Sequence, residues 1–123
     1  MKYEITGYKE KSEYTSDKGI TSIVYLMDCI EGLKQMPHLP NCLSVVDPPY
    51  GIGISSNPFR QKFEKCDWDN AIPNKKYFDE LMRVSKNQII WGGNYFDLPP
   101  SQGFIIWDKK QPQDFSSAMC EMA

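Results

Sequence analysis

The residue types with the clearest chemical use lie in the stretch SVVDPPYGIG, residues 44–53. Asp47 places a carboxylate directly after a run of strand-forming residues, and Pro48 and Pro49 follow it. Both prolines must lie outside the strand, at its carboxyl end, because proline cannot donate a hydrogen bond to a sheet. Open α/β sheets bind their ligands beyond the carboxyl ends of their strands. The sequence therefore predicts a chemical site around Asp47.

A carboxylate beside a fixed carbonyl suits methylation of the exocyclic amino nitrogen of a nucleobase. That nitrogen is a poor nucleophile because its lone pair is delocalised into the ring. Two rigid acceptors, one for each amino hydrogen, would draw it toward tetrahedral geometry. Asp47 offers the carboxylate, and Pro48 offers a carbonyl whose direction the following Pro49 fixes. Tyr50 offers an aromatic face for a base rotated out of a duplex, and Gly51 leaves room for close backbone approach.

Strands and helices alternate around this site. The residue pattern predicts strands at 20–27, 41–47, 88–96 and 103–109 and helices at 28–37 and 74–87. This order indicates an α/β fold with a mostly parallel sheet flanked by helices. The strand before Asp47 is continuously apolar, which is typical of a sheet covered on both faces.

The segments between and beyond these elements carry three further expectations. Residues 1–19 are expected to be a polar lead-in, and residues 114–123 to begin a helix. Residues 49–72 show no sustained periodicity, and a stretch that long without structure is uncommon unless it is functional or mobile.

Composition bounds the class of protein. The chain has 123 residues, of which 41% are hydrophobic and 24% charged, as expected for a single domain with one modest core. Its formal net charge of −2 gives no general attraction to nucleic acid or to anionic membranes. Binding to DNA would therefore depend on a local site.

Metal and membrane chemistry are not indicated. The four cysteines form no C-x-x-C pair, and with one histidine they offer too few well-spaced zinc ligands. No apolar stretch approaches the roughly 20 residues of a membrane span. The sequence predicts a soluble, cytoplasmic protein with reduced thiols, no metal and no membrane partner.

Asp-Pro-Pro-Tyr at the end of a strand strongly resembles the catalytic motif of DNA amino-methyltransferases. These enzymes use S-adenosylmethionine to methylate adenine or the amino group of cytosine. The resemblance extends through most of the chain from Met27, over the stretches MDCIEGLKQMP, WDNAIPNKKYFDELMRVSKNQIIWGGNYF and GFIIWDKKQP. It implies part of a Rossmann-like methyltransferase fold, S-adenosylmethionine as cofactor, double-stranded DNA as partner, and adenine-specific DNA methylation of the restriction-modification kind.

The same resemblance assigns roles to particular residues. It implies Asp47, Pro48, Pro49 and Tyr50 for catalysis, Asp28 and Asp47 for the cofactor, and Tyr50, Gly51, Trp91 and Asn94 for the target base. Two of these assignments have ordinary alternatives. Asp28 would also cap the helix that follows it, and Trp91 and Asn94 would also suit a tight turn with a core tryptophan.

The resemblance is to the class in which the catalytic half precedes the cofactor half. The cofactor-binding turn of the family, F-x-G-x-G after a strand, does not occur in these 123 residues. We therefore expect residues 1–123 to be the catalytic half of a methyltransferase domain. The cofactor motif and the target-recognition region would lie further along a longer polypeptide, and these residues alone would be inactive.

Two other hypotheses remain open. The acceptor could be the amino group of cytosine, an RNA base or a glutamine amide, each of which offers a similar planar nitrogen. Alternatively, the chain could be a non-catalytic remnant that folds, or forms a homodimer, without cofactor.

Cations close to aromatic rings form a second candidate for DNA contact. They are Phe59, Arg60, Lys62, Phe63 and Lys65 in the segment without periodicity, with Lys109 and Lys110 near the last strand. Such a composition suits phosphates and splayed bases. A solvated loop or a charged strand end would have the same composition.

Overall fold

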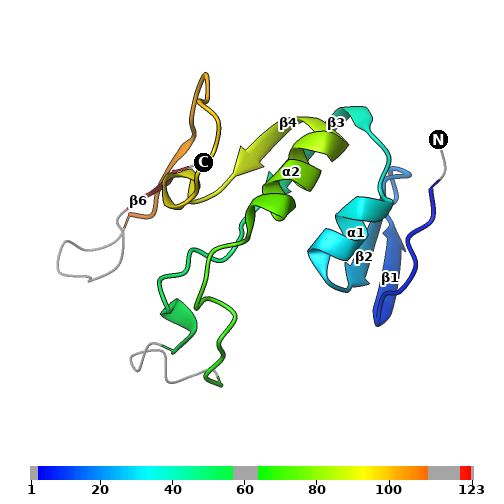
Figure 1. Cartoon of the computed structure of the whole chain (residues 1–123). Coiled ribbons are helices and arrows are strands. Elements are labelled where there is room, and N and C mark those ends of the chain that lie inside the picture. Colours follow the sequence, from blue (N-terminus) through cyan, green and yellow to red (C-terminus); the bar gives the residue numbers. More distant parts are fainter. Residues whose placement is uncertain (1–2, 57–63, 111–119, 123) are drawn as a thin grey trace.

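The fold is described from a computed structural model, over residues 3–56, 64–110 and 120–122. This part of the chain forms three two-stranded sheets. The sheets pair β1 (Glu10–Thr15) with β2 (Thr21–Leu26), β3 (Leu39–Val46) with β4 (Ser85–Ile90), and β5 (Ile106–Asp108) with β6 (Cys120–Met122). The helices are α1 (Cys29–Gln35) and α2 (Lys75–Val84), with short 3₁₀ turns η1 (Ile54–Ser56) and η2 (Gly93–Tyr95). Helix α2 lies along the β3–β4 pair (Figure 1).

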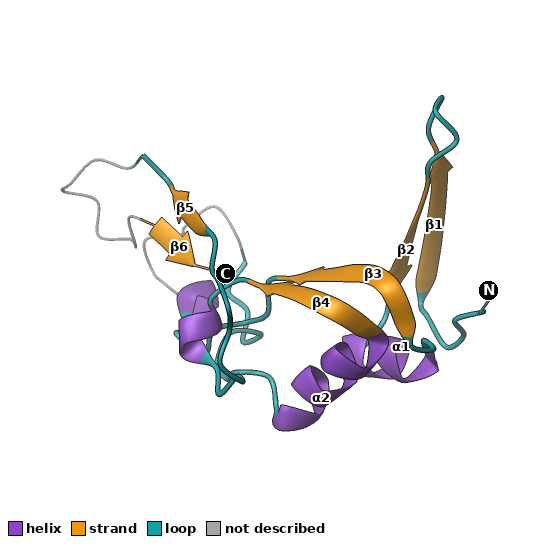
Figure 2. Ribbon diagram, turned by 90° about the horizontal axis from the view of Figure 1, so that it is seen from above, coloured by secondary structure: helices purple, strands orange, loops and turns teal. Residues whose placement is uncertain are grey.

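The parallel pair β3–β4 forms the middle of the molecule. Val46 pairs with Ile90 at its carboxyl end. The backbone N–H of Trp91 donates to the carbonyl of Val46 at 2.9 Å, which carries the pairing one residue beyond β4. Helix α2 lies along one face of this pair with α1 beside it (Figure 2). The expected α/β character is confirmed in this coarse form.

The buried core lies between α2 and β4. Tyr77, Phe78 and Leu81 come from α2, and they pack against Ile90 and Phe96. The three helix positions share one face because residues three and four apart are neighbours on a helix. Burial raises the pKa of the Tyr77 phenol to about 12.

Arg83 joins the two helices. Its guanidinium donates to the carbonyls of Leu33 at 2.8 Å and Met36 at 2.9 Å, at the C-terminal end of α1. A cation there complements the helix dipole, and it is a second donor to the Leu33 carbonyl, which also accepts from the N–H of Met36 at 3.0 Å. The position of α1 beside α2 is therefore fixed by directed hydrogen bonds as well as by packing.

The first strands differ from the sequence-based expectation. Residues 1–19 were expected to be a lead-in, but Glu10–Thr15 is strand β1, which pairs antiparallel with β2. A turn explains the pairing, since Gly19 has φ +75° and donates to the carbonyl of Ser16 at 2.9 Å. This local hairpin takes β2 away from β3. Of the three strand pairs in the described residues only one is parallel, so the expectation of a mostly parallel sheet is wrong for them.

The face of β3 opposite α2 is open. Leu43 and Val45 are 55% and 58% exposed, although the apolar sequence of this strand predicted cover on both faces. Side chains alternate along a strand, so α2 covers one set and leaves these two residues to solvent. The prediction of a sheet covered on both sides is not met in the part of the chain that the structure describes.

Several element ends also differ. Helix α2 ends at Val84 rather than near 87, because Ser85 is extended (φ −127°, ψ 146°) and begins β4 without a connecting loop. The strand expected over 88–96 stops at Ile90, where a Gly-Gly turn follows. The helix expected to begin within 114–123 is contradicted at Cys120–Met122, which form a strand, while 111–119 lie outside the described residues.

Candidate functional site

The carboxyl ends of β3 and β4 form the candidate site. Asp47 follows β3 directly, and Trp91 follows β4 directly, so the parallel register places both at the same edge of the sheet. Residues 47–50 lie outside the strand, as the prolines predicted. The Asp47 side chain belongs to an exposed residue, whereas Pro48 is buried. An acceptor is therefore presented to solvent on a fixed backbone.

Tyr50 contacts several described residues through its hydroxyl and its ring. Its hydroxyl donates to Oδ1 of Asp47 at 2.6 Å. Its ring stacks on Tyr95, with centroids 4.9 Å apart and planes within 6°, and it meets the Phe96 ring at a tilt. Parallel stacks of this kind stabilise aromatic pairs beyond the area that they bury. The structure thus joins Asp47 and Tyr50 through the tyrosine hydroxyl and adds Tyr95 to them.

Gly92 is required where Tyr50 packs against the turn after β4. It has φ +68°, a left-handed backbone conformation that L side chains rarely adopt. A Cβ at this position would lie 2.3 Å from Cε1 of Tyr50. The tyrosine ring therefore packs directly on the backbone of Gly92, and no larger residue fits there unless the ring moves. The sequence showed the Gly-Gly turn but not this contact.

Asp69 is a site residue that the sequence analysis did not select. It is 1% exposed, and its carboxylate accepts hydrogen bonds from the backbone N–H groups of Gly51 (3.0 Å) and Ile54 (2.9 Å). The segment after Tyr50 is thereby tied to a residue 18 positions from Gly51. An aspartate between a tryptophan and an asparagine gives no local signal of such a role, because its partners are distant in the sequence.

Asp28 lies elsewhere and caps helix α1. Its Oδ1 accepts hydrogen bonds from the backbone N–H groups of Ile30 at 2.9 Å and Glu31 at 3.1 Å. The strand before it, β2, belongs to the β1–β2 sheet and not to the β3–β4 pair (Figure 2). The structure therefore does not bring Asp28 to the sheet edge that carries Asp47, and the capping alternative describes its contacts.

Replacing Asp28 separates capping from cofactor binding. We expect Asp28→Ala to lower the free energy of unfolding by about 1 kcal/mol, the usual cost of a lost N-cap, and Asp28→Asn to change it little. Thermal melts of both variants measure this. If Asp28→Asn weakened S-adenosylmethionine binding in calorimetric titration while the melting temperature was unchanged, the carboxylate would have a role beyond the cap.

Two of the residues expected around the target base, Trp91 and Asn94, lie shortly after β4. Trp91 is half-buried and meets Trp107 edge to face, with ring centroids 6.0 Å apart. Lys109 Nζ lies 5.7 Å from the centre of the Trp107 ring. Asn94 is exposed on η2, one residue before Tyr95. Trp91 therefore contacts β5 through Trp107.

Lys110 forms a local turn with Asp108. It has φ +53°, its backbone N–H donates to Oδ1 of Asp108 at 2.9 Å, and its Nζ lies 3.0 Å from Oδ2 of Asp108. The backbone hydrogen bond and then the side-chain bond lower the pKa of Asp108. This pairing matches the charged strand end that was the alternative to a DNA contact. Of the other cations proposed for DNA, Lys65 is exposed, and Arg60 and Lys62 lie outside the described residues, as do Phe59 and Phe63.

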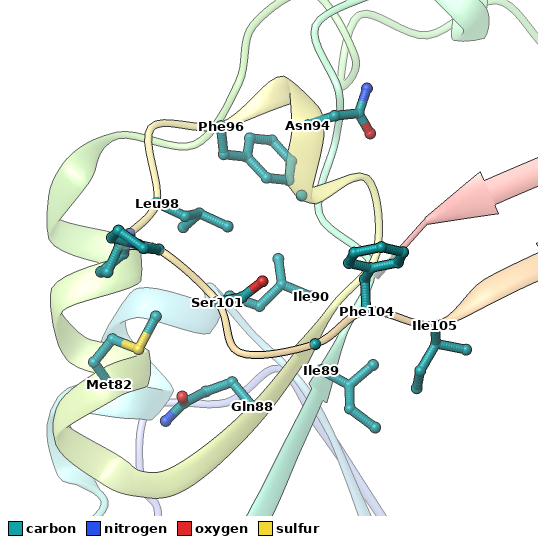
Figure 3. Close-up of a pocket in the computed structure, with 14 residues that line it drawn as sticks. Met82, Gln88, Ile89, Ile90, Asn94, Phe96, Leu98, Ser101, Phe104 and Ile105 are labelled. Carbon is teal, nitrogen blue, oxygen red and sulfur yellow. The ribbon is translucent and has the colours of Figure 1, made fainter.

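A separate cavity of about 630 Å³ lies beside β4 (Figure 3). Ile90, Phe96 and Leu98 line it together with Phe104 from the segment before β5, so its character is largely apolar. Of the residues expected to bind the target base, Asn94 reaches this cavity. The Asp47–Tyr50 pair does not line it, and the cavity is therefore distinct from the candidate catalytic groups.

The described residues offer neither a metal-binding group nor a membrane-spanning helix. Within residues 3–56, 64–110 and 120–122, no three His, Cys, Asp or Glu side chains are grouped so that they could hold a metal ion. Over the same residues, no helix has both the length and the apolar character needed to cross a membrane.

Comparisons with known proteins identify no family for this chain. The chain matches no protein-family model, no curated protein and no solved structure.

Proposed function

We propose that this chain is the catalytic half of an S-adenosylmethionine-dependent DNA methyltransferase that acts on the N6 amino group of adenine. The observation that supports this most is the Asp47–Tyr50 pair at the carboxyl end of a parallel strand, with a 2.6 Å hydrogen bond from hydroxyl to carboxylate. Two prolines separate the pair and restrict its backbone. The family resemblance of the Asp-Pro-Pro-Tyr motif supplies the substrate class.

In this proposal Asp47 and Pro48 receive the amino group of an extruded base. Tyr50 holds Oδ1 of Asp47, which orients the carboxylate so that Oδ2 accepts one amino hydrogen, and the carbonyl of Pro48 accepts the other. Both acceptors are positioned before the base arrives, so their alignment costs no reorganisation during the reaction. The methylated amino group becomes strongly acidic, and it releases its proton to water or to Asp47.

S-adenosylmethionine, when bound, supplies the electrophilic methyl group. The described residues do not build its site: Asp28 caps α1 away from the sheet edge that carries Asp47, and no glycine turn of the F-x-G-x-G form occurs in the sequence. Within the proposal, methyl transfer requires a segment that carries such a turn, and these 123 residues alone are expected to be inactive.

Tyr95 affects how a base reaches Tyr50. Because the two rings are stacked at 4.9 Å, Tyr95 covers one face of Tyr50, while Tyr95 itself is 41% exposed. An extruded base would either stack on the outer face of Tyr95 or replace it on Tyr50. Either arrangement uses the aromatic contact that such enzymes need once a base has left the duplex.

The proposal is tested with radiolabelled S-adenosylmethionine and a panel of acceptors. The natural polypeptide that contains this chain is incubated with double-stranded DNA, structured RNA or a glutamine-containing peptide, and the label in each is counted. We expect label in DNA, located in N6-methyladenine after digestion to nucleosides. Label in RNA, peptide or N4-methylcytosine would favour the alternative acceptors. No label with any acceptor, together with no S-adenosylmethionine binding in calorimetry, would favour the non-catalytic remnant.

A further inference from the structure

Asp69 is a buried carboxylate whose two oxygens are both used by the loop after Tyr50. Oδ1 accepts from the N–H of Gly51 at 3.0 Å and Oδ2 from the N–H of Ile54 at 2.9 Å, while the N–H of Gly53 donates to the Asp69 carbonyl at 3.0 Å. The residue is 1% exposed. A buried carboxylate is costly unless it is hydrogen-bonded, and the bonds from Gly51 and Ile54 meet this need. Together with the bond from Gly53, they tie the loop to Asp69.

The loop needs such an anchor because of its glycines. Gly51 and Gly53 have φ +69° and +67°, and glycine restricts the backbone least of all residues. A Cβ at Gly51 would lie 3.1 Å from the backbone nitrogen of Ile72, so the loop also packs closely on the segment that follows Asp69. Tyr50 therefore has a rigid proline on its N-terminal side and a flexible glycine on its C-terminal side.

We propose that Asp69 is a positioning residue for the base-binding site. By accepting the N–H of Gly51, Asp69 fixes the peptide bond that follows Tyr50. That bond in turn fixes the Tyr50 side chain, whose ring packs on Gly92 and whose hydroxyl donates to Asp47. The part of Asp69 in catalysis rests on the proposed function. Its part in fixing the tyrosine does not, and the two can be measured separately.

Asp69→Asn is the sharpest variant, because it keeps the shape of the side chain and replaces one acceptor oxygen by an NH₂ donor. One of the two amides, Gly51 or Ile54, then faces a donor. The matched control is Asp67→Asn, which makes the same change at an exposed residue two positions earlier. We expect amide hydrogen exchange of Gly51 or Ile54 to quicken roughly tenfold or more in Asp69→Asn, since that amide loses a strong hydrogen bond to a carboxylate.

The position of Tyr50 is read by NMR on the 123-residue chain, without DNA or cofactor. In the wild type and in Asp67→Asn, a nuclear Overhauser contact joins the Tyr50 ring to the Hα protons of Gly92. In Asp69→Asn we expect this contact to be lost. Its retention would overturn the proposal. If Asp69→Asn did not fold, amide hydrogen exchange of the wild type would test the proposal. Unprotected amides at both Gly51 and Ile54 would show that the anchor does not exist. Slow exchange at both would support it.

Base extrusion is measured in the natural polypeptide with 2-aminopurine at the target position of the DNA. Misplacement of about 1 Å can cost on the order of 100-fold in rate, so we expect Asp69→Asn to lower extrusion and kcat by roughly 10- to 100-fold. Affinity for S-adenosylmethionine should stay within about twofold, a split that general destabilisation would not produce. If the wild type extruded no base while Asp69→Asn lost the Tyr50–Gly92 contact, the proposed function would fail and the positioning role would stand. Normal extrusion and kcat in Asp69→Asn would contradict the catalytic role.

Discussion

Asp47→Ala is expected to reduce methyl transfer to DNA by roughly 100-fold or more, the usual loss when one positioned hydrogen-bonding group is removed from a reacting centre. The change removes the acceptor for an amino hydrogen and also the partner of the Tyr50 hydroxyl. Asp47 is exposed and lies after β3, so the fold and cofactor binding should be largely retained. Initial rates of radiolabel transfer by the natural polypeptide measure the effect.

The matched control for this experiment is Asp97→Ala. Asp97 is also exposed and lies just beyond η2, so the variant removes a carboxylate of the same kind close to the site without touching Tyr50. Asp97→Ala should transfer methyl groups at close to the wild-type rate. Activity of Asp47→Ala within about threefold of that rate would remove Asp47 from the mechanism.

Gly92→Ala is expected to expel the Tyr50 ring from its present position. The added Cβ would lie 2.3 Å from Cε1 of the ring, a separation that real carbon atoms do not tolerate. If the ring is the platform for the base, its displacement should weaken base extrusion by roughly 5- to 150-fold, equivalent to a lost stack of about 1–3 kcal/mol. Fluorescence of 2-aminopurine at the target position reports this equilibrium.

The control for Gly92→Ala must reproduce its backbone strain without the clash. Gly19 suits this purpose, because its φ is +75° and no atom lies within 4 Å of the position that a Cβ would take. Gly19→Ala should lower the melting temperature through left-handed strain and leave extrusion unchanged. If Gly92→Ala lowered stability and extrusion only as far as Gly19→Ala does, the contact between Gly92 and Tyr50 would have no part in base binding.

Local patterns predicted the local features of this molecule. Helix α1 begins where Asp28 was expected to cap it, and the prolines after Val46 end β3 as their chemistry requires. The hairpin β1–β2 was not predicted, since its first strand is polar and alternates too weakly to be told from a lead-in. Because that strand was missed, the sequence did not show that β2 pairs antiparallel with β1 across the turn at Gly19.

The contacts that define the site were beyond sequence reasoning because they join distant segments. Tyr50 meets Gly92 and Tyr95 only after α2 returns the chain to the sheet and places β4 parallel to β3. Asp69 contacts the loop at Gly51 across 18 positions, and its burial depends on tertiary packing rather than on its neighbours in sequence. The motif therefore indicated where the candidate site lies, but not which distant residues contact it.

The most direct test of the central claim is the identity of the methylated base. The natural polypeptide, as wild type and as Asp47→Ala, is expressed in cells that make no adenine methylation of their own. Their DNA is then digested to nucleosides and analysed by mass spectrometry. We expect N6-methyladenine with the wild type and none with Asp47→Ala. Wild-type DNA without N6-methyladenine, or equal amounts of it with both proteins, would contradict the claim that Asp47 and Tyr50 form the site of adenine methylation.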